Sequence, residues 1–401
     1  MFTMSQINTD SKKIKELLER GVDEVIDRND LEKKLKSGRE LRVKLGIDPT
    51  SPNLHLGRAI PLLKMRDFQE LGHQLVFIVG DFTGVIGDTS DKDSERPMMS
   101  PEQIRKNMKD YVKQAGRVIN IRKAEVHYNS KWLKRLTYDK IGEQADQFSL
   151  AEFNARENIK KRLAEGKRVS LREVLYPLMQ GYDSVAIKAD VEIGGTDQRF
   201  NLLAGRQLQK HFGQEQQNII MGPLLEGMDG RKMSSSWGNV INLTDRPKDM
   251  FGKVMSVPDG LIMKYFTLAT RAPLADLKGV EFQLKSGANP RDVKAKLARE
   301  IVKLYHNEKE ALVAEEAFNR QFKDKEVPDD VREVRLSSAR LDIVDLLVET
   351  KLVSSKSGAR RMVEQGGVRI DGKKITSLGE VEVKSGSVVQ VGKRKFVRIT
   401  I

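Results

Sequence analysis

The sequence predicts an α/β protein in which a helical insertion interrupts an α/β core, followed by a helical domain and a small α+β domain. Three observations support this fold class. Strand-like and helix-like hydrophobic patterns alternate over residues 40–90 and again over about 180–245. The stretches 98–180 and 247–323 carry apolar residues at helical spacing, and the last 63 residues end in strand-like alternation. A chain of 401 residues is long enough for two or three such domains.

The N-terminal region and the first half of the core come first in the chain. Residues 8–36 have the apolar spacing of one or two charged amphipathic helices. Residues 41–47 then alternate like a strand that two prolines end, and residues 57–71 have one apolar helical face. A second strand is expected over 73–79. Strand, loop, helix and strand in this order build a Rossmann-like nucleotide-binding core, in which ligands lie beyond the carboxyl ends of the strands.

The loop and first helical turn between these strands carry candidate phosphate-binding residues. Thr50 and His55 have side chains that could donate hydrogen bonds to a triphosphate as charge builds up during displacement. Gly57 allows a flat ring to approach the backbone closely, and Arg58 adds a fixed positive charge. The helix N-terminus adds unpaired N–H groups. Taken alone, His55 is better explained as a histidine in a surface loop, so the interpretation depends on a second motif.

The second motif is a basic loop about 175 residues downstream, with the sequence Lys232-Met233-Ser234-Ser235-Ser236. Glycines bracket it, which suits a lid, and its cations suit the stabilisation of departing pyrophosphate. With His55-Leu56-Gly57-Arg58 upstream, it resembles the second of the two ATP-binding signatures of class I aminoacyl-tRNA synthetases. The resemblance implies that the catalytic residues are His55, Arg58, Lys232 and Arg231, and that ATP is bound by Asp48, Thr50, His55, Gly57, Asp197, Lys232 and Ser234.

The chain departs from both signatures at one position each. The family has a second histidine where this chain has Arg58, and a second lysine where it has Ser235. Arginine keeps both a donor and a positive charge at the first position. At the second, the neighbouring Arg231 is predicted to supply the missing charge. We therefore expect Arg231→Ala to slow adenylate formation far more than it weakens tRNA binding.

A polar helix face predicts the substrate. Tyr176, Gln180 and Asp183 are spaced four and three residues apart, so they share one face of an otherwise apolar helix. A buried carboxylate needs a donor partner, and the phenol of a substrate would provide one. A pocket built to bond that hydroxyl rejects phenylalanine strongly. With this Tyr-x-x-x-Gln-x-x-Asp helix, the chain resembles the bacterial tyrosyl-tRNA synthetases.

The resemblance also implies a substrate-binding set and a reaction. The ammonium of tyrosine would be held by Tyr176 and Gln180, and its phenol would donate to Asp183. The full predicted set for tyrosine is Lys44, Asp88, Tyr176, Gln180, Asp183 and Gln198. Tyrosine and ATP, with Mg²⁺, would form tyrosyl-adenylate and pyrophosphate, and the tyrosyl group would pass to the 3′ end of tRNA(Tyr). The insertion at 98–180 would carry the interface of a homodimer.

The C-terminal 63 residues resemble a small RNA-binding fold of ribosomal and RNA-modifying proteins. They hold 13 Lys/Arg and 7 Asp/Glu, a balance of +6. Ser357 is predicted to cap a helix that Gly366-Gly367 ends, and Asp371-Gly372 predicts a hairpin turn. The predicted RNA-binding residues are Lys356, Arg360, Arg361, Lys373 and Lys374. A solvated helix face is the alternative for the arginines.

Composition narrows the class of protein further. The net charge of +14, from 71 basic and 57 acidic residues, favours a polyanionic partner. There is no cysteine, which excludes disulfides and thiolate catalysis. The five histidines lack metal-ligand spacing, so no metal-ligating residues are predicted. No apolar run reaches the roughly 20 residues that span a bilayer, and no signal pattern is seen, so a cytoplasmic protein without membrane contact is expected.

The expected boundaries are a catalytic domain over 1–246, a helical domain over 247–325, a linker over 326–338 and an RNA-binding domain over 339–401. Three other interpretations stay open. A tryptophanyl-tRNA synthetase would share fold and chemistry, with Asp183 accepting from an indole N–H. A synthetase that lost its activity could act as an RNA-binding protein, because both signatures are altered. A small-molecule nucleotidyltransferase would share the His-x-Gly loop.

Overall fold

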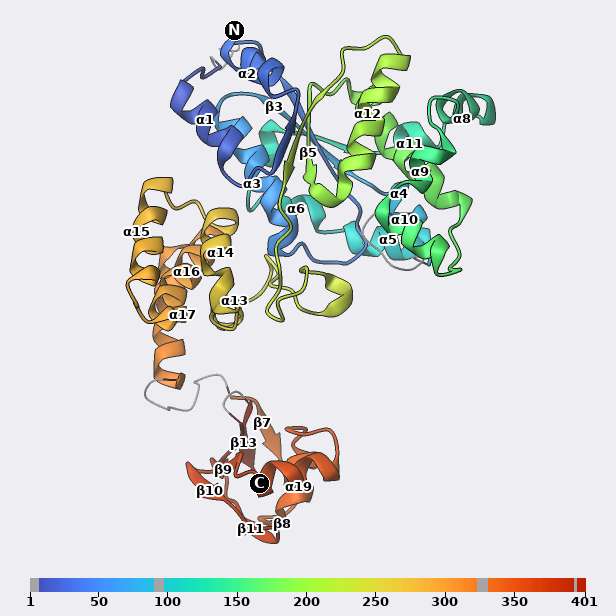
Figure 1. The fold of residues 1–401 in the computed structure, drawn as a ribbon. Coiled ribbons are helices and arrows are strands. Elements are labelled where there is room, and N and C mark those ends of the chain that lie inside the picture. The colour runs from blue at the N-terminus through green and yellow to red at the C-terminus, as the bar shows by residue number, and fades with distance from the viewer. Residues whose placement is uncertain (1–6, 90–96, 323–330, 393–394) are drawn as a thin grey trace. The chain divides into compact units, whose positions relative to one another are not determined.

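The structure of the chain is a computed structural model that describes residues 7–89, 97–322, 331–392 and 395–401. The chain forms two compact units, Met1–Ala311 and Leu312–Ile401, whose elements Figure 1 labels. The polar segment 323–330 and the basic residues Lys393 and Arg394 lie outside the described residues. No helix of the described ranges is both long and apolar enough to cross a membrane.

The first unit is built on a sheet in the strand order β1-β6-β5-β2-β3-β4. All neighbours in it are parallel except β1, which runs antiparallel to β6. The third strand reads Gln-Leu-Val-Phe-Ile-Val and is buried along almost its whole length, as expected for a parallel strand covered on both faces. The strands are β1 Glu24–Ile26, β2 Arg42–Ile47, β3 Gln74–Val79, β4 Glu125–Tyr128, β5 Val191–Gly195 and β6 Asn218–Gly222.

Helices cover both faces of this sheet (Figure 1). From β2 the chain crosses over through α3 Leu56–Glu70 to β3, whereas from β5 it crosses in the other direction through α12 Arg199–His211 to β6. Because such crossovers are right-handed, the two helices lie on opposite faces. Helix α11, Leu171–Ile187, packs beside α12, where Gly181 leaves room for the backbone of Ala204. The predicted helix over 57–71 and the polar helix that contains Tyr176 are therefore confirmed.

Two short strands of the first unit, β1 and β4, were not predicted from the sequence. Residues 8–36 form two helices, α1 Ser11–Glu19 and α2 Arg28–Lys36, but β1 lies between them as an edge strand. Three residues are too few for a hydrophobic period, and the pairing of Val25 with Ile220 lies almost 200 residues away along the chain. The insertion contains β4, which extends the core sheet, and its expected end at residue 180 falls inside α11.

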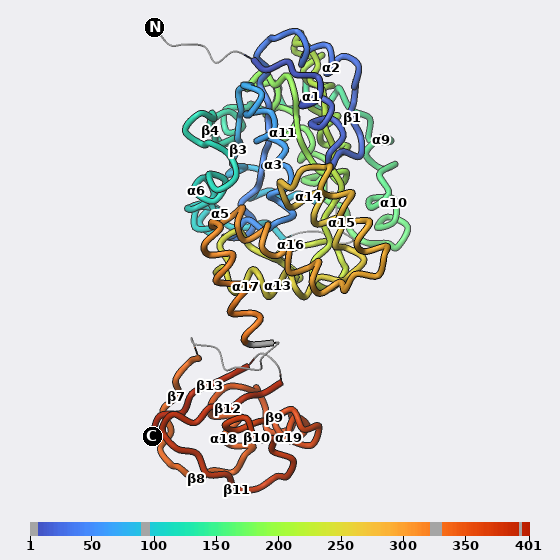
Figure 2. Tube along the Cα trace, turned by 90° about the vertical axis from the view of Figure 1, so that its left-hand side faces the viewer, coloured from blue at the N-terminus to red at the C-terminus, as the bar shows by residue number. Residues whose placement is uncertain are grey.

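The remaining helices of the first unit fall into two groups. The insertion holds α5 Pro101–Met108, α6 Tyr111–Ala115, α7 Ser130–Leu133, α8 Tyr138–Ala145, α9 Leu150–Asn154 and α10 Glu157–Ala164, and α4 Thr83–Ile86 precedes it. The later helical region holds α13 Pro247–Met255, α14 Ile262–Ala269, α15 Leu274–Lys285 and α16 Pro290–Tyr305, and α17 Glu308–Phe322 begins in the first unit and continues past its end at Ala311. Helix α14 lies next to α3 (Figure 2), and the Arg271 guanidinium that follows it pairs with Glu70 at 2.7 Å.

The second unit has its own sheet and core. Its five strands follow the order β10-β9-β12-β13-β7, and a separate pair joins β11 and β8. The strands are β7 Glu333–Arg335, β8 Arg340–Asp342, β9 Val368–Ile370, β10 Lys373–Ile375, β11 Glu380–Glu382, β12 Val388–Val391 and β13 Lys395–Thr400. Helices α18 Ile343–Glu349 and α19 Lys356–Glu364 contribute Leu346 and Val363 to a core that also contains Val389 and Val397.

Local predictions in this unit had mixed outcomes. The hairpin at Asp371-Gly372 is confirmed, since both residues have the positive φ angles (46° and 79°) of a primed turn between β9 and β10. The cap at Ser357 is wrong. Ser355, two residues earlier, is the N-cap, and its hydroxyl accepts from the Gly358 N–H. Part of the expected linker is β7, which pairs with β13 and is too short and charged to be recognised in the sequence.

Candidate active site

A cavity of about 570 Å³ opens at the carboxyl ends of the parallel strands in the first unit. Strands β2 and β5 pair only at Val43 with Val191 and at Lys44 with Glu192, and the residues that follow in both strands line the cavity. This is the switch point of the sheet, where ligands of open α/β proteins bind. The predicted residues that line it are Asp48, Thr50, His55, Gly57, Arg58, Asp88, Tyr176, Gln180, Asp183, Asp197, Gln198, Lys232 and Ser234.

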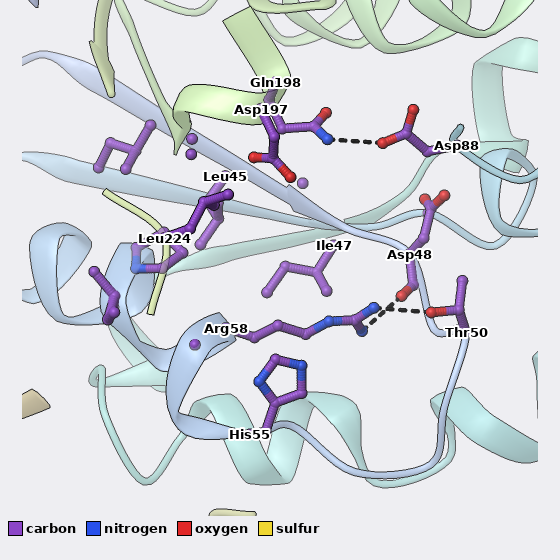
Figure 3. A pocket seen from close by; sticks show the side chains of 18 of the residues that line it. Leu45, Ile47, Asp48, Thr50, His55, Arg58, Asp88, Asp197, Gln198 and Leu224 are labelled. Carbon is purple, nitrogen blue, oxygen red and sulfur yellow. Dashed lines mark hydrogen bonds between the residues drawn. The ribbon is translucent and has the colours of Figure 1, made fainter. Parts of the chain in front are cut away.

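Arg58 ties the loop after β2 to the helix that follows it. Its guanidinium donates to the Asp48 carbonyl at 3.0 Å, to the Tyr111 hydroxyl at 2.8 Å and to the Thr50 hydroxyl at 2.8 Å. Figure 3 shows the guanidinium pointing at this loop. The arginine that replaces the family's histidine therefore holds the loop in place while its charge stays at the cavity wall.

His55 is a buried, neutral imidazole at the N-cap of α3. Removal from water, with the positive charges of Arg58 and Lys232 nearby, lowers the pKa of His55 to about 3. Its Nδ1 is buried and has no hydrogen-bond partner among the described residues. A Cβ added at Gly57 would lie 3.1 Å from this nitrogen and 3.7 Å from the Met233 Cβ. Any side chain at position 57 would thus crowd the space between the two signatures.

The second signature lies on one arm of a hairpin. The Gly227 N–H donates to the Arg231 carbonyl at 2.7 Å, and the Met233 N–H donates to the Leu225 carbonyl at 2.8 Å. On this arm the Lys232 ammonium points at the cavity and pairs with the Asp197 carboxylate at 2.8 Å. The predicted ATP-binding residues from two distant segments are therefore in direct contact.

Asn239 holds this hairpin and was not predicted. Its side-chain oxygen accepts from the Ser234 N–H at 2.8 Å, and its amide nitrogen donates to the Asp229 carboxylate at 2.7 Å and to the Lys232 carbonyl at 3.1 Å. It is only 5% exposed. An asparagine behind a glycine looks like a turn residue in the sequence, so nothing there indicated these contacts.

Arg231 does not line the cavity, contrary to the prediction that it replaces the missing lysine. Its guanidinium pairs with Asp229 at 2.6 Å and lies 4.8 Å from the centre of the Trp237 ring. The side chain is 60% exposed. Ser235, at the position of the family lysine, donates instead to the Ser51 hydroxyl at 3.1 Å in the loop of the first signature.

The other end of the cavity is formed by α11. Asp183 is almost fully buried, and its carboxylate accepts from the Trp132 indole N–H at 2.7 Å and from the Asn129 amide at 3.2 Å. Removal from water raises the pKa of Asp183 to about 7, against the opposing effect of the Lys44 charge and the two donors. Trp132 was expected only as an apolar anchor, and Asn129 was not predicted.

Tyr176 and Asp48 form a buried pair between α11 and the loop after β2. The Tyr176 hydroxyl donates to the Asp48 carboxylate at 2.9 Å, and the Thr83 hydroxyl donates to it at 2.6 Å. Burial, with Asp88 nearby, raises the pKa of Asp48 to about 6. Asp88 itself accepts from the Gln198 amide at 2.7 Å, a contact drawn in Figure 3.

Lys44, which was predicted as part of the tyrosine-binding set, is not among the residues that line the cavity. Its side chain is fully buried. The ammonium donates to the Gln180 carbonyl at 2.9 Å and to the Ser184 hydroxyl at 2.7 Å, and it pairs with Glu192 at 2.8 Å. Glu192 was not predicted, because a glutamate in a strand carries no sequence signal of its partner.

The predicted RNA-binding residues lie in the second unit. Lys356, Arg360, Arg361, Lys373 and Lys374 are all exposed there. Lys356 pairs with Asp345 at 2.7 Å. The Lys374 side chain lies over Gly366, where an added Cβ would come within 2.5 Å of its ammonium nitrogen. Lys374 thus stands at the C-terminus of α19, a favourable place for a cation.

Two family models match the chain. One, described as tRNA synthetases class I (W and Y), matches residues 6–323. The other, described as a tyrosine–tRNA ligase SYY-like C-terminal domain, matches residues 323–399.

Similar proteins cover nearly the whole chain. The tyrosine–tRNA ligase 2 of Clostridium acetobutylicum is 44% identical over 391 residues, which are 96% of this chain and 98% of that protein. The tyrosine–tRNA ligase of Shewanella oneidensis is 46% identical over 388 residues, 96% of this chain and 97% of that protein. Among solved structures, a truncated mitochondrial tyrosyl-tRNA synthetase of Aspergillus nidulans has a TM-score of 0.66 at 20% identity, covering 77% of this chain and 94% of that one. The likeness to that structure concerns the fold alone.

Proposed function

The chain belongs to the class I tRNA synthetases (W and Y), and from this membership we propose that it is a tyrosine–tRNA ligase. The observation that supports tyrosine is the buried Asp183 carboxylate at one end of the cavity. Two neutral donors already bond to it, from Trp132 and Asn129. A substrate phenol would add a third donor in the same place. Phenylalanine would leave this acceptor without that donor and would be rejected.

The first step of the proposed reaction joins tyrosine to ATP, which enters as its Mg²⁺ complex. A carboxylate oxygen of tyrosine attacks the α-phosphorus, the bond from that phosphorus to the bridging oxygen breaks, and pyrophosphate leaves. No side chain acts as a nucleophile. The protein positions the reactants and supplies positive charge, as in other phosphoryl transfers.

The ATP end of the cavity carries the cations for this step. Lys232 and Arg58 both line the cavity, and the neutral His55 adds an N–H donor. The Lys232 ammonium pairs with Asp197, so we propose that ATP draws it towards the β- and γ-phosphates as negative charge accumulates there. Asp197 would then accept from the ribose hydroxyls.

In the second step the 3′-terminal ribose of tRNA(Tyr) attacks the tyrosyl carbonyl carbon, and AMP leaves. The exposed basic residues of the second unit would hold the tRNA by its phosphates, which gives position more than sequence recognition. Substituting Arg360 and Arg361 together by alanine should therefore weaken tRNA binding and flatten its salt dependence. Tyrosine activation should be unchanged.

We also propose a homodimer through the insertion. Tyr138, Leu171 and Leu150 are 94%, 82% and 61% exposed there, and large apolar side chains left in water often mark an interface. A cytoplasmic location is part of the same proposal, because ATP and tRNA are used there. Analytical ultracentrifugation of the full chain should give the mass of a dimer, and Tyr138→Glu with Leu171→Glu should give that of a monomer.

The experiment that tests the activity is amino-acid-dependent ATP–pyrophosphate exchange with the purified chain. Exchange with tyrosine and none with phenylalanine or tryptophan is expected. Exchange with tryptophan alone would assign the chain to the tryptophan enzymes. No exchange with any of the three, from folded protein that binds tRNA, would contradict the enzyme and favour an RNA-binding protein that has lost its activity.

A further inference from the structure

An ion pair lies at the bottom of the cavity, at the point where the central strands separate. Lys44 of β2 and Glu192 of β5 are register partners in the last paired position of the two strands. Their side chains are 0% and 2% exposed, and the ammonium and carboxylate lie 2.8 Å apart. Glu192 itself lines the cavity, and so do Leu45 and Ile193 one residue further, whereas Lys44 does not. The pair therefore stands at the floor of the proposed tyrosine subsite.

The Lys44 ammonium has no hydrogen left for a substrate. An ammonium has three donors. The Gln180 carbonyl, the Ser184 hydroxyl and the Glu192 carboxylate accept them at 2.7 to 2.9 Å. Two of these three acceptors belong to α11, the helix that carries Asp183. Lys44 thus acts on the cavity through its neighbours, and it fastens β2 and β5 to one turn of α11.

Glu192 in turn fixes the side chain of Gln180. Its carboxylate accepts from the Gln180 amide nitrogen at 3.4 Å, from the Ser184 hydroxyl at 3.1 Å and from the Gln217 amide. Because the nitrogen end of the Gln180 amide faces a carboxylate, its oxygen end is the one available to the cavity that Gln180 lines. An oxygen is what an ammonium group needs, since an ammonium only donates.

We propose that the Lys44–Glu192 ion pair is the positioning element of the tyrosine subsite, which orients the Gln180 amide towards the substrate ammonium and keeps Asp183 able to accept from the substrate phenol. This inference rests on the proposed tyrosine ligase activity. It assigns both residues a role through α11, and neither needs to touch the reacting atoms.

The two members of the pair act on Asp183 in opposite directions. The Lys44 charge lowers the pKa of Asp183, and the Glu192 charge raises it. Other groups also surround Asp183. The Trp132 and Asn129 donors bond to it, and the Tyr176 phenol on its own helix interacts with it electrostatically. Tyr176 in turn bonds to the Asp48 carboxylate, and the His127 ring lies 5.8 Å from that of Trp132. Lys44 and Glu192 are both charged and fully buried. Changing either of them should therefore shift the pKa of Asp183 more directly than changing the other groups.

The test compares Lys44→Met and Glu192→Gln in the full chain by the pH dependence of kcat/KM for tyrosine in ATP–pyrophosphate exchange. With Lys44→Met the acid limb should move to higher pH by about 1 unit, because Asp183 loses a nearby positive charge. With Glu192→Gln the limb should move to lower pH. Both variants should lose about tenfold or more in kcat/KM for tyrosine while KM for ATP is unchanged, since a misplaced positioning group costs this much.

A matched control is Lys34→Met. Lys34 is another buried lysine beside the same sheet, bonded to Glu215, Asp30 and Asn218 at 2.8, 2.9 and 3.0 Å, but it does not line the cavity. This variant should lose stability without moving the acid limb. A purely structural role for Lys44 would make its variant behave in the same way.

Each outcome decides the proposal. The proposal is supported if the acid limbs of the Lys44→Met and Glu192→Gln pH profiles move in opposite directions. It is overturned if the two limbs stay in place or move in the same direction. If Lys44→Met does not fold, the double variant Lys44→Met with Glu192→Gln replaces it, because it leaves no unpaired buried charge. The acid limb of the double variant should then lie at a higher pH than that of Glu192→Gln alone. If the two limbs lie at the same pH, the proposal is overturned. Absence of tyrosine-dependent exchange in the unsubstituted chain would instead refute the ligase activity.

Discussion

The two ends of the cavity are held in place in different ways. At the end that carries Asp183, the charged groups are buried and take their partners from distant segments, as Lys44 does from β5 and α11. At the end that carries the second signature, the hairpin takes several partners that are near in sequence, while Lys232 pairs with Asp197 and Ser235 bonds to Ser51 from more distant segments. Arg231 pairs with Asp229, and Asn239 bonds to Ser234. We infer that the first end is rigid and sets selectivity, whereas the second is a local hairpin whose side chains can exchange partners when ATP binds.

The largest expected effect comes from breaking the rigid end at its acceptor. Asp183→Asn keeps the shape but replaces an accepting oxygen by a donating nitrogen next to the Trp132 N–H. We expect kcat/KM for tyrosine to fall about a thousandfold and most of the discrimination against phenylalanine to be lost. Exchange assays with both amino acids measure this. Discrimination at the unsubstituted level would mean that another group reads the phenol.

The next largest effect comes from the cation of the hairpin. Lys232→Met should lower kcat of exchange about a hundredfold, because it removes a donor from the charge that develops on the phosphates. KM for tyrosine should stay the same, since Lys232 lies at the other end. Lys264→Met is the control, a lysine paired with Glu226 at 2.8 Å that does not line the cavity. Equal losses in both variants would show that the hairpin merely unfolds.

The two ends of the cavity should also differ in their response to pH. The pKa of Asp183 is raised to about 7, so below that pH more of it is protonated and is a weaker acceptor for a phenol. We expect kcat/KM for tyrosine to fall about tenfold per pH unit below this pKa. The pKa of His55 is lowered to about 3, so the imidazole is neutral on both sides of pH 7. The pH profile of kcat/KM for ATP at saturating tyrosine should therefore show no acid limb that comes from His55. An acid limb that disappears in His55→Asn would show that His55 is protonated in this range and would contradict its neutral state.

The sequence predicted those parts of the fold whose signal is local. The helix that follows Gly57, the face shared by Tyr176, Gln180 and Asp183, and the turn at Asp371 are each determined by residues within a few positions of one another. It failed for contacts that only the assembled sheet creates. The register that places Glu192 opposite Lys44 joins residues about 150 positions apart, and nothing near either residue identifies the other.

The same distinction applies to the site. Asp48 and Asp197 were predicted through the motifs in which they lie, and the structure brings them to one cavity. Trp132 was taken for an apolar anchor, because an indole N–H reveals its acceptor only once α7 and α11 are packed together. The hydrogen bond from Trp132 to Asp183 could therefore not be predicted from local sequence patterns.

A smaller effect is expected from the residue that holds the hairpin. Asn239→Ala removes the bonds to the Ser234 N–H and the Lys232 carbonyl, so Lys232 is held less well. We expect kcat of exchange to fall about fivefold, which corresponds to the net free-energy contribution of one hydrogen bond. Asn239→Asp keeps the acceptor for Ser234 but places a carboxylate beside Asp229, and it should lose more. If Asn239→Asp were the milder of the two, the donors of Asn239 would be unimportant.

The smallest effect is expected at Arg231, and it tests the comparison most sharply because Arg231 and Lys232 are neighbours. Successive residues of an extended strand point to opposite sides. Lys232 faces the cavity and Asp197, whereas Arg231 faces Asp229 and the ring of Trp237 in solvent. An exposed pair of this kind contributes about 0.2–1 kcal/mol, so Arg231→Ala should change kcat of exchange by less than about threefold. A loss that approaches that of Lys232→Met would show that the hairpin turns over when ATP binds, and that Arg231 then takes the place of the lysine the family has at Ser235.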